Sequence, residues 1–130
     1  MVLIYVDSSV ALAYLFTEPR QPRPDIWAGR LVSSRLLEYE IWTRLHGRRP
    51  GVVATDSVRA LLAGTELIDL SRPVLIRALD PWPIPLRTID ALHLATADYL
   101  RQRGEAVELA SYDRRLVAAA EALAIPIAKL

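Results

Sequence analysis

The sequence predicts an α/β fold: a three-layer α/β/α sandwich around a mainly parallel sheet of four or five strands. Short apolar runs rich in β-branched residues, beginning with VLIYV at 2–6, are typical of strands buried on both faces. Helical patterns lie between these runs, and such alternation indicates a parallel sheet covered by helices on both sides. The 130 residues fit one domain, 1–130, that can bury a hydrophobic core without cross-links.

The order of the elements follows from the apolar runs and from the residues that end them. Strands are predicted at 2–6, 30–33, 67–70, 107–110 and 125–128. Helices are predicted at 8–16, 35–48, 52–64, 73–79, 88–103 and 114–124. Asp7 or Ser8 can cap the first helix, and Pro73 suits the start of the short one. Gly47 and Gly104 are expected to end the helices that precede them.

Two proline-rich stretches are predicted to interrupt this pattern. Residues 18–29 contain three prolines and should form a loop or a broken helical turn. Residues 81–85 hold prolines at both ends and in the middle, which excludes regular structure.

Composition removes several classes of function. The chain has no cysteine, which excludes disulfides, thiolate zinc sites, iron–sulfur clusters and cysteine nucleophiles. Its net charge is +1, so no strong basic field indicates a nucleic-acid partner. The apolar stretch 2–16 contains Asp7, lacks a basic region before it and is shorter than the ~20 residues of a membrane-spanning helix. We therefore expect no membrane association, and a cytoplasmic location.

Two aspartates follow predicted strands. Asp7 comes directly after 2–6, and Asp113 closes the LASYD segment at 109–113, which begins within the predicted strand 107–110. The carboxyl ends of parallel strands share one edge of a sheet, where α/β proteins form their sites, so both carboxylates should lie at that edge, on neighbouring strands. The alternative for each is a helix cap, a common role for aspartate.

Four further acidic residues lie on predicted helices. Asp90 opens the apolar segment DALHLATA, where a charge is costly unless it is paired or binds a metal; the alternative is interaction with the helix dipole. Asp98 is a possible additional ligand or the partner of an arginine. Glu38 and Glu40 flank the apolar stripe of 35–48, and periodicity does not decide which of them points inward or whether both are solvated.

Carboxylates that converge without a countercharge repel one another, which favours raised pKa values or a bound cation. All-oxygen ligands select hard ions such as Mg²⁺ or Mn²⁺, which can activate water for attack on a phosphodiester. His46 and His93 lack metal-ligand spacing, and His93 is expected to be packed or hydrogen-bonded between helices. The sequence has neither a glycine-rich phosphate loop nor a GxSxG motif.

Four segments together resemble the PIN-domain family, and most closely its VapC-type toxins. They are VLIYVDSSVALAYLF, RLVSSRLLEYEIWTRL, LRTIDALHLATADYL and LASYDRRLVAAAEALAIPI, which occur in the order of the family. The resemblance implies that the four acids of the site are Asp7, Glu40, Asp90 and Asp113, because EIWTR matches the family pattern when Glu40 is taken. Ser8 and Ser111 fall at positions where the family often has hydroxyls near the metal.

The resemblance also implies a function: Mg²⁺- or Mn²⁺-dependent cleavage of RNA, commonly tRNA or rRNA. It further implies a homodimer and a cognate antitoxin whose tail lies across the active site. Trp27, Trp42 and Trp82 are candidates for a dimer interface, and ordinary core packing is the alternative. The chain departs from the family at 18–30, where EPRQPRPDIWAGR is short and proline-rich, which leaves the geometry of partner binding open.

Two other classes of function compete with this hypothesis. A phosphatase of the haloacid-dehalogenase type requires a second aspartate two residues after the first, where this chain has Ser9, and a receiver domain requires an acidic pair. A PIN-like binding module without catalysis is the other alternative, although it usually lacks some of the four acids, all of which are present here.

Overall fold

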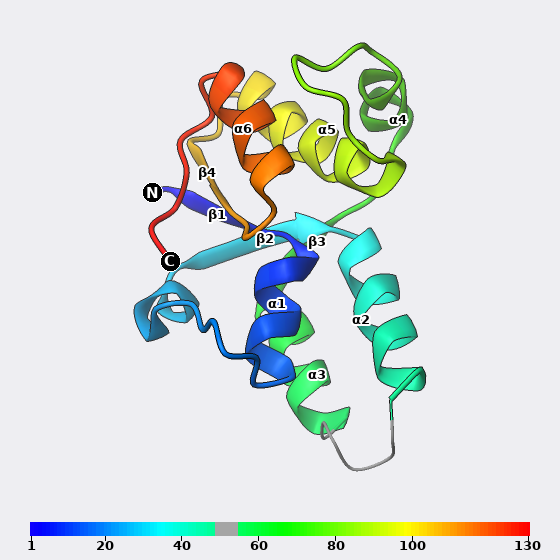
Figure 1. Ribbon diagram of the computed structural model, residues 1–130. Coiled ribbons are helices and arrows are strands. Elements are labelled where there is room, and N and C mark those ends of the chain that lie inside the picture. The colour runs from blue at the N-terminus through cyan, green and yellow to red at the C-terminus, as the bar shows by residue number, and fades with distance from the viewer. Residues whose placement is uncertain (49–54) are drawn as a thin grey trace.

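The computed structural model describes residues 1–48 and 55–130, so the start of the helix predicted at 52–64 lies outside the described residues (Figure 1). The strands are β1 (Leu3–Val6), β2 (Arg30–Ser34), β3 (Thr65–Ile68) and β4 (Val107–Ala110). The helices are α1 (Ser8–Leu15), α2 (Leu36–His46), α3 (Thr55–Ala63), α4 (Arg72–Ala78), α5 (Thr88–Gln102) and α6 (Arg114–Ala122), with a 3₁₀ helix η1 (Pro24–Ala28).

The four strands form one parallel sheet in the order β3-β2-β1-β4. In β1, Leu3 pairs with Arg30 of β2 on one side and with Val107 of β4 on the other. The predicted α/β class with a parallel sheet is therefore confirmed. β1, the first strand along the chain, is therefore an interior strand, with β2 on one side and β4 on the other.

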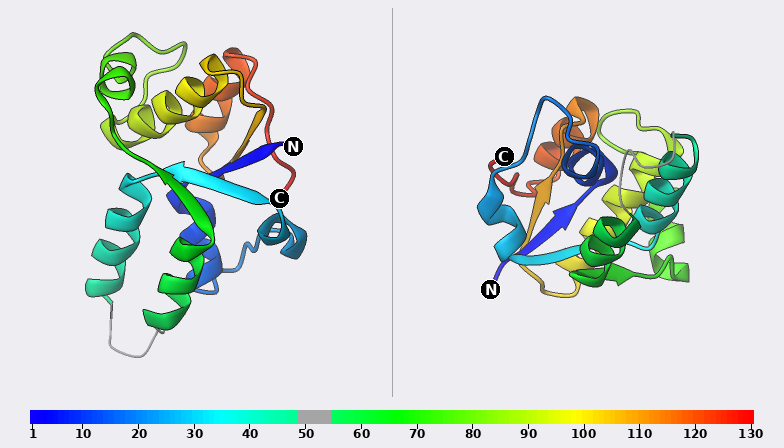
Figure 2. Two further views of the ribbon diagram at one scale, coloured as in Figure 1. Left: turned by 180° about the vertical axis from the view of Figure 1, so that it is seen from behind. Right: turned by 90° about the horizontal axis from the view of Figure 1, so that it is seen from below.

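Helices cover both faces of this sheet, as the two views of Figure 2 show together with Figure 1. One core layer packs α1, α2 and α3 under the sheet through residues such as Val10, Leu37, Ile41 and Val58. The other packs α5 and α6 above it through Leu94, Leu100, Leu116 and Ala120, and α4 packs against α5. This arrangement is the predicted three-layer sandwich.

Two of the predicted strands differ from the structure. The third strand is 65–68, two residues earlier than predicted, because an edge strand can expose Glu66 while Thr65 is buried. The segment 125–128 forms only a single bridge between Ile127 and Leu109, so the prediction of a strand there was wrong. Pro126 lacks the N–H that a ladder requires, which limits pairing at this edge.

The proline-rich stretch 18–29 contains the broken helical turn that the sequence predicts, η1. All three tryptophans are partly buried and pack against the core clusters, which is the alternative to an interface role. Among residues 1–48 and 55–130, the helices are too short or too polar to cross a membrane.

Gly104 ends α5 as predicted, with a φ of +91° that side chains rarely adopt. We expect Gly104→Ala to lower the free energy of unfolding by about 1–2 kcal/mol, because the methyl group is strained in the left-handed region. Denaturant unfolding measures the loss. Gly47→Ala is the matched control: its φ is −82° and an added Cβ would meet only ordinary contacts at 3.7 Å, so stability should not fall. Equal losses for both variants would contradict the backbone explanation.

Candidate active site

The predicted edge of the sheet brings two of the aspartates together. Asp7 directly follows β1, and Asp113 lies three residues beyond the end of β4, which is the neighbour of β1. The chain leaves β1 for β2 on one side, whereas β4 pairs on the other side, so this is a point where strand order reverses. The predicted adjacency of the two strand ends is confirmed.

Asp7 is both a helix cap and a buried acid. Its carboxylate accepts hydrogen bonds from the backbone N–H of Val10 at 3.2 Å, from the Ser9 hydroxyl at 2.6 Å and from the Ser111 hydroxyl at 2.5 Å. The side chain is only 3% exposed. Burial raises the pKa of Asp7, and the hydrogen bonds from Ser111 and Ser9 offset that effect only in part.

Ser9 is a site residue whose role the sequence did not reveal. Besides donating to Asp7, its oxygen accepts the backbone N–H of Tyr112 at 2.9 Å, so it ties α1 to the loop after β4. The only sequence signal was its position two residues after Asp7. Ser111 was predicted as a supporting hydroxyl, and the structure places it on Asp7.

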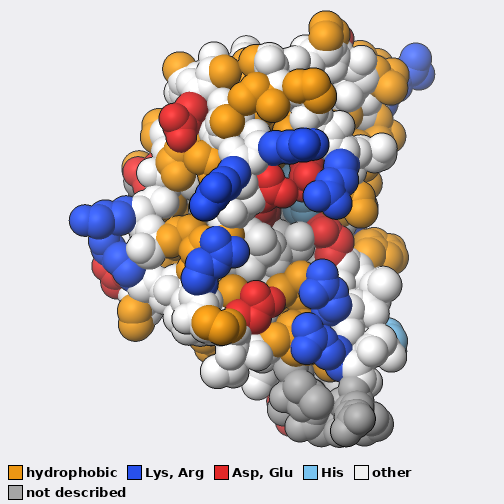
Figure 3. All heavy atoms as spheres, viewed as in Figure 1, with side chains coloured by type: hydrophobic (Ala, Val, Ile, Leu, Met, Phe, Trp, Pro, Cys, Tyr) orange, Lys and Arg blue, Asp and Glu red, His pale blue; other side chains and the backbone are white. Residues whose placement is uncertain are grey.

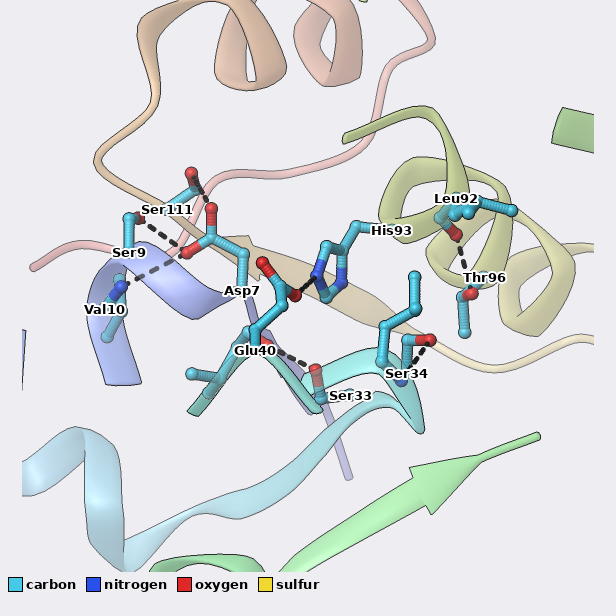
Figure 4. Close-up of polar contacts among 12 residues, drawn as sticks. Asp7, Ser9, Val10, Ser33, Ser34, Glu40, Leu92, His93, Thr96 and Ser111 are labelled. Carbon is cyan, nitrogen blue, oxygen red and sulfur yellow. Dashed lines mark hydrogen bonds and ion pairs between the residues drawn. The ribbon is translucent and has the colours of Figure 1, made fainter. Parts of the chain in front are cut away.

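A buried chain of hydrogen bonds joins the sheet to Glu40. His93 of α5 lies 2.5 Å from the Glu40 carboxylate through Nε2 and 2.8 Å from the Tyr5 hydroxyl through Nδ1. Because an ionised carboxylate can only accept, Nε2–H donates to Glu40, and a neutral ring then accepts the Tyr5 proton. The expected hydrogen-bonded role of His93 between helices is confirmed. Figure 4 shows Glu40 and His93 directed toward one another, whereas the Asp7 carboxylate beside them is directed toward Ser9 and Ser111.

These contacts distinguish Glu40 from Glu38, which the helical pattern alone could not do. Burial acts to raise the pKa of Glu40, but the hydrogen bond from His93, together with the hydrogen bond from Ser8 and the charge of Arg44, lowers it below its usual value. Glu38 instead lies 3.7 Å from Arg35, at the start of the same helix. Glu40 is thus the glutamate of this helix that reaches the site.

Asp113 and Asp90 begin the helices that follow. Asp113 caps α6, and one of its oxygens accepts the backbone N–H groups of Arg115 and Leu116 at 2.9 and 3.0 Å. Asp90 lies in the first turn of α5. Burial raises its pKa, and the charges of Asp113 and Asp7 raise it further. Asp90 thus lies within reach of the charges of Asp113 and Asp7 at the edge of the sheet.

A cavity of about 500 Å³ opens above this edge, and Glu40, Asp90 and Asp113 line it together with Arg44 and Arg87. Figure 3 shows acidic side chains in a hollow on this face, with basic side chains around them. As the side chains stand, no three Asp, Glu or His residues within 1–48 and 55–130 lie close enough to hold one ion. The four predicted acids therefore share one region but do not form a tight cluster.

Asp98 does not belong to this region. It is 5% exposed and pairs with Arg77 at 2.9 Å and with Arg101 at 3.7 Å. Of its two predicted roles, pairing with an arginine is confirmed.

The model of the PIN domain matches residues 4–122, nearly the whole chain and every element of the site. The chain belongs to the PIN-domain family. It is also similar to three ribonucleases of Mycobacterium tuberculosis: VapC46 of strain ATCC 25618 / H37Rv is 33% identical over 98% of this chain and 97% of its own. VapC35 of the same strain is 30% identical over 96% and 95%, and VapC47 of strain CDC 1551 / Oshkosh is 29% identical over 88% of each chain.

Because the chain belongs to the PIN-domain family, it is neither a phosphatase of the haloacid-dehalogenase type nor a receiver domain. At the position where such a phosphatase would have its second aspartate, Ser9 instead donates a hydrogen bond to Asp7. The family match extends through the short segment 18–30, whose proline-rich chain forms η1 beside α1.

Tyr5→Phe tests the buried hydrogen-bonded chain. We expect it to lower the free energy of unfolding by about 1–3 kcal/mol, because His93 Nδ1 loses its partner in a site from which water is excluded. Thermal or denaturant unfolding measures the loss. Tyr39→Phe removes the same hydroxyl from a residue that is 65% exposed and should change stability by less than about 0.5 kcal/mol. A Tyr5→Phe protein as stable as the parent would contradict the inferred hydrogen bond.

Proposed function

We propose that this protein is a metal-dependent endoribonuclease, the toxin of a toxin–antitoxin pair, in which Asp7, Glu40, Asp90 and Asp113 form the active site. The observation that carries the proposal is the cavity lined by three of these carboxylates, with Asp7 buried at the end of the adjoining strand. The PIN-domain match and the three similar ribonucleases support it.

The donor set suits a hard divalent cation, Mg²⁺ or Mn²⁺. Its side chains offer carboxylate and hydroxyl oxygens, and each carboxylate oxygen that accepts one hydrogen bond keeps a second lone pair for a metal. Burial raises the pKa values of Asp7 and Asp90, and the charges of Asp113 and Asp7 raise that of Asp90 further, so a cation would relieve an electrostatic cost. When bound, the ion would supply an activated water and neutralise charge on the phosphate under attack.

The protein's own residues orient the acids and attract the substrate. Ser9 and Ser111 hold the Asp7 carboxylate, the first turn of α6 holds Asp113, and His93 holds Glu40. Arg44 and Arg87 line the same cavity, where their guanidinium groups can bind phosphate oxygens. Local arginines at the rim thus offset the negative charge of the acids, which a net charge of +1 could not do.

The partners in this proposal are an RNA, with tRNA or rRNA as the expected class, and a cognate antitoxin protein. We further propose a homodimer that acts in the cytoplasm. These proposals rest on the family resemblance and on the similar VapC ribonucleases.

Neutral variants of the acids separate a metal site from a set of helix caps. Asp7→Asn and Asp90→Asn should each nearly abolish RNA cleavage, and Asp113→Asn should retain some. Losses should not add in double variants, because the acids act as a unit. In EDTA, Asp7→Asn should melt at an equal or higher temperature at neutral pH, since a carboxyl whose pKa is raised by burial destabilises the folded state when it ionises. Asparagine still caps a helix.

The measurements are melting temperature and cleavage on the same proteins, with EDTA and with Mn²⁺. Mn²⁺ should stabilise the parent more than the variants, because it binds only the folded site. Glu66→Gln is the control, since its exposed ion pair with Arg30 at 3.5 Å should contribute little. Asp7→Asn and Asp90→Asn proteins that are destabilised yet fully active would contradict a catalytic role for these two residues.

The toxin role predicts a phenotype in bacteria. Expression of the chain alone should arrest growth because cellular RNA is cut, and co-expression of the small protein encoded beside it should relieve the arrest. Growth curves and RNA gels measure both effects, with Asp90→Asn as the inactive control. Normal growth despite accumulation of the metal-loaded parent would argue against a toxin.

A further inference from the structure

Beside the acidic cavity lies a groove of about 420 Å³ between α1, α2 and the start of α5. Its wall is one stripe of α2, at spacings that place side chains on a single helical face: Leu36, Tyr39, Glu40, Thr43, Arg44 and Gly47. The adjoining face of α2 is buried through Leu37 and Ile41. The groove is therefore built on a helix that the core fixes, and its volume falls within the range of small-ligand sites, about 300–1,000 Å³.

The groove and the acidic cavity are continuous. Ser8, Glu40 and Arg44 line both of them, and so does Ile89 from the first turn of α5. A ligand whose phosphate lies in the cavity would therefore extend its next group into the groove. Arg44 stands at the junction, where its positive charge complements a phosphate.

The surface of the groove is partly apolar and partly polar. Tyr39 is 65% exposed and Ile89 is 45% exposed, so an aromatic ring and a branched aliphatic side chain border the same depression. Thr43 and Ser8 add hydroxyls that can donate or accept hydrogen bonds. An aromatic face with nearby hydroxyls and a cation is the set of groups that binds an unstacked base and its phosphate.

We propose that this groove is a subsite for one unpaired nucleotide next to the scissile phosphate, with Tyr39 stacking on its base and Arg44 contacting its phosphate. The inference rests on the proposed ribonuclease function and narrows its substrate to RNA that is single-stranded at the cut. A base within a duplex is stacked between its neighbours and cannot enter the groove. Continuity with the acidic cavity and the charge of Arg44 favour this occupant over a protein segment.

The test measures binding of labelled oligoribonucleotides in Mg²⁺ by fluorescence anisotropy. All proteins carry Asp90→Asn so that the RNA stays intact, and this residue lines the cavity but not the groove. Tyr39→Leu should weaken binding of single-stranded RNA by about 5- to 150-fold, the equivalent of ~1–3 kcal/mol for one stacked base. Tyr39→Phe should bind like the Tyr39 protein. Leu79→Ala, at an 85% exposed position of the α4 end, is the control and should have no effect.

Two further measurements identify the contact. A series of RNAs, each lacking one base, locates the contact along the strand. For the RNA that lacks the base bound by Tyr39, Tyr39→Leu should cause no further loss of affinity, because two changes that delete the same contact are not additive. For the other RNAs of the series, Tyr39→Leu should weaken binding as before. Arg44→Gln should reduce the slope of log affinity against log salt by about 0.7, whereas Tyr39→Leu should leave the slope unchanged. These results would support stacking by Tyr39 and phosphate binding by Arg44.

Several outcomes overturn the proposal. Tight RNA binding that is unchanged by Tyr39→Leu removes the subsite and leaves the ribonuclease function standing. Failure of the Asp90→Asn protein to bind any RNA, with no cleavage by the parent, removes both. If light scattering shows that Tyr39→Leu converts a dimer to a monomer, the groove is an interface between copies of the chain and not a nucleotide site.

Discussion

The arrangement of the site depends on one interaction, the burial of the Asp7 carboxylate at the end of an interior strand. Taking an ionised carboxylate out of water is costly, so the surroundings must supply donors. They come from three places: the first turn of α1, the Ser9 hydroxyl and the Ser111 hydroxyl that follows β4. The need to solvate this single acid thus ties α1 and the loop after β4 to the end of β1.

The chain from Tyr5 to Glu40 extends this constraint to both helical layers. Tyr5 is on β1, His93 is on α5 above the sheet, and Glu40 is on α2 below it. The imidazole therefore joins elements that pack on opposite faces of the sheet. Because His93 is 1% exposed, its two nitrogens need these partners, and the position of Glu40 depends on the packing of both layers.

The sequence could predict whatever follows from a residue's place on a strand or helix. Asp7 and Asp113 were predictable at one edge because each follows a parallel strand, and Gly104 was predictable as a helix end. The helical pattern could not choose between Glu40 and Glu38, and only the family resemblance indicated Glu40. The physical reason lies in the contact with His93, which is 53 residues from Glu40 along the chain. The misplaced edge strand has a similar cause: Glu66 breaks the apolar run, and only pairing with β2 fixes the register of 65–68.

The two halves of the site differ in what holds them, and this has a consequence for specificity. The strand-end acids are fixed by backbone and hydroxyl donors, so changes there disturb caps and buried charges. The groove is instead one face of α2, whose adjoining face packs in the core through Leu37 and Ile41. Residues such as Tyr39 and Thr43 can therefore change without creating a cavity in the core. Under the proposed function, the chemistry would reside at the sheet edge, and the choice of RNA could vary along a single helical stripe.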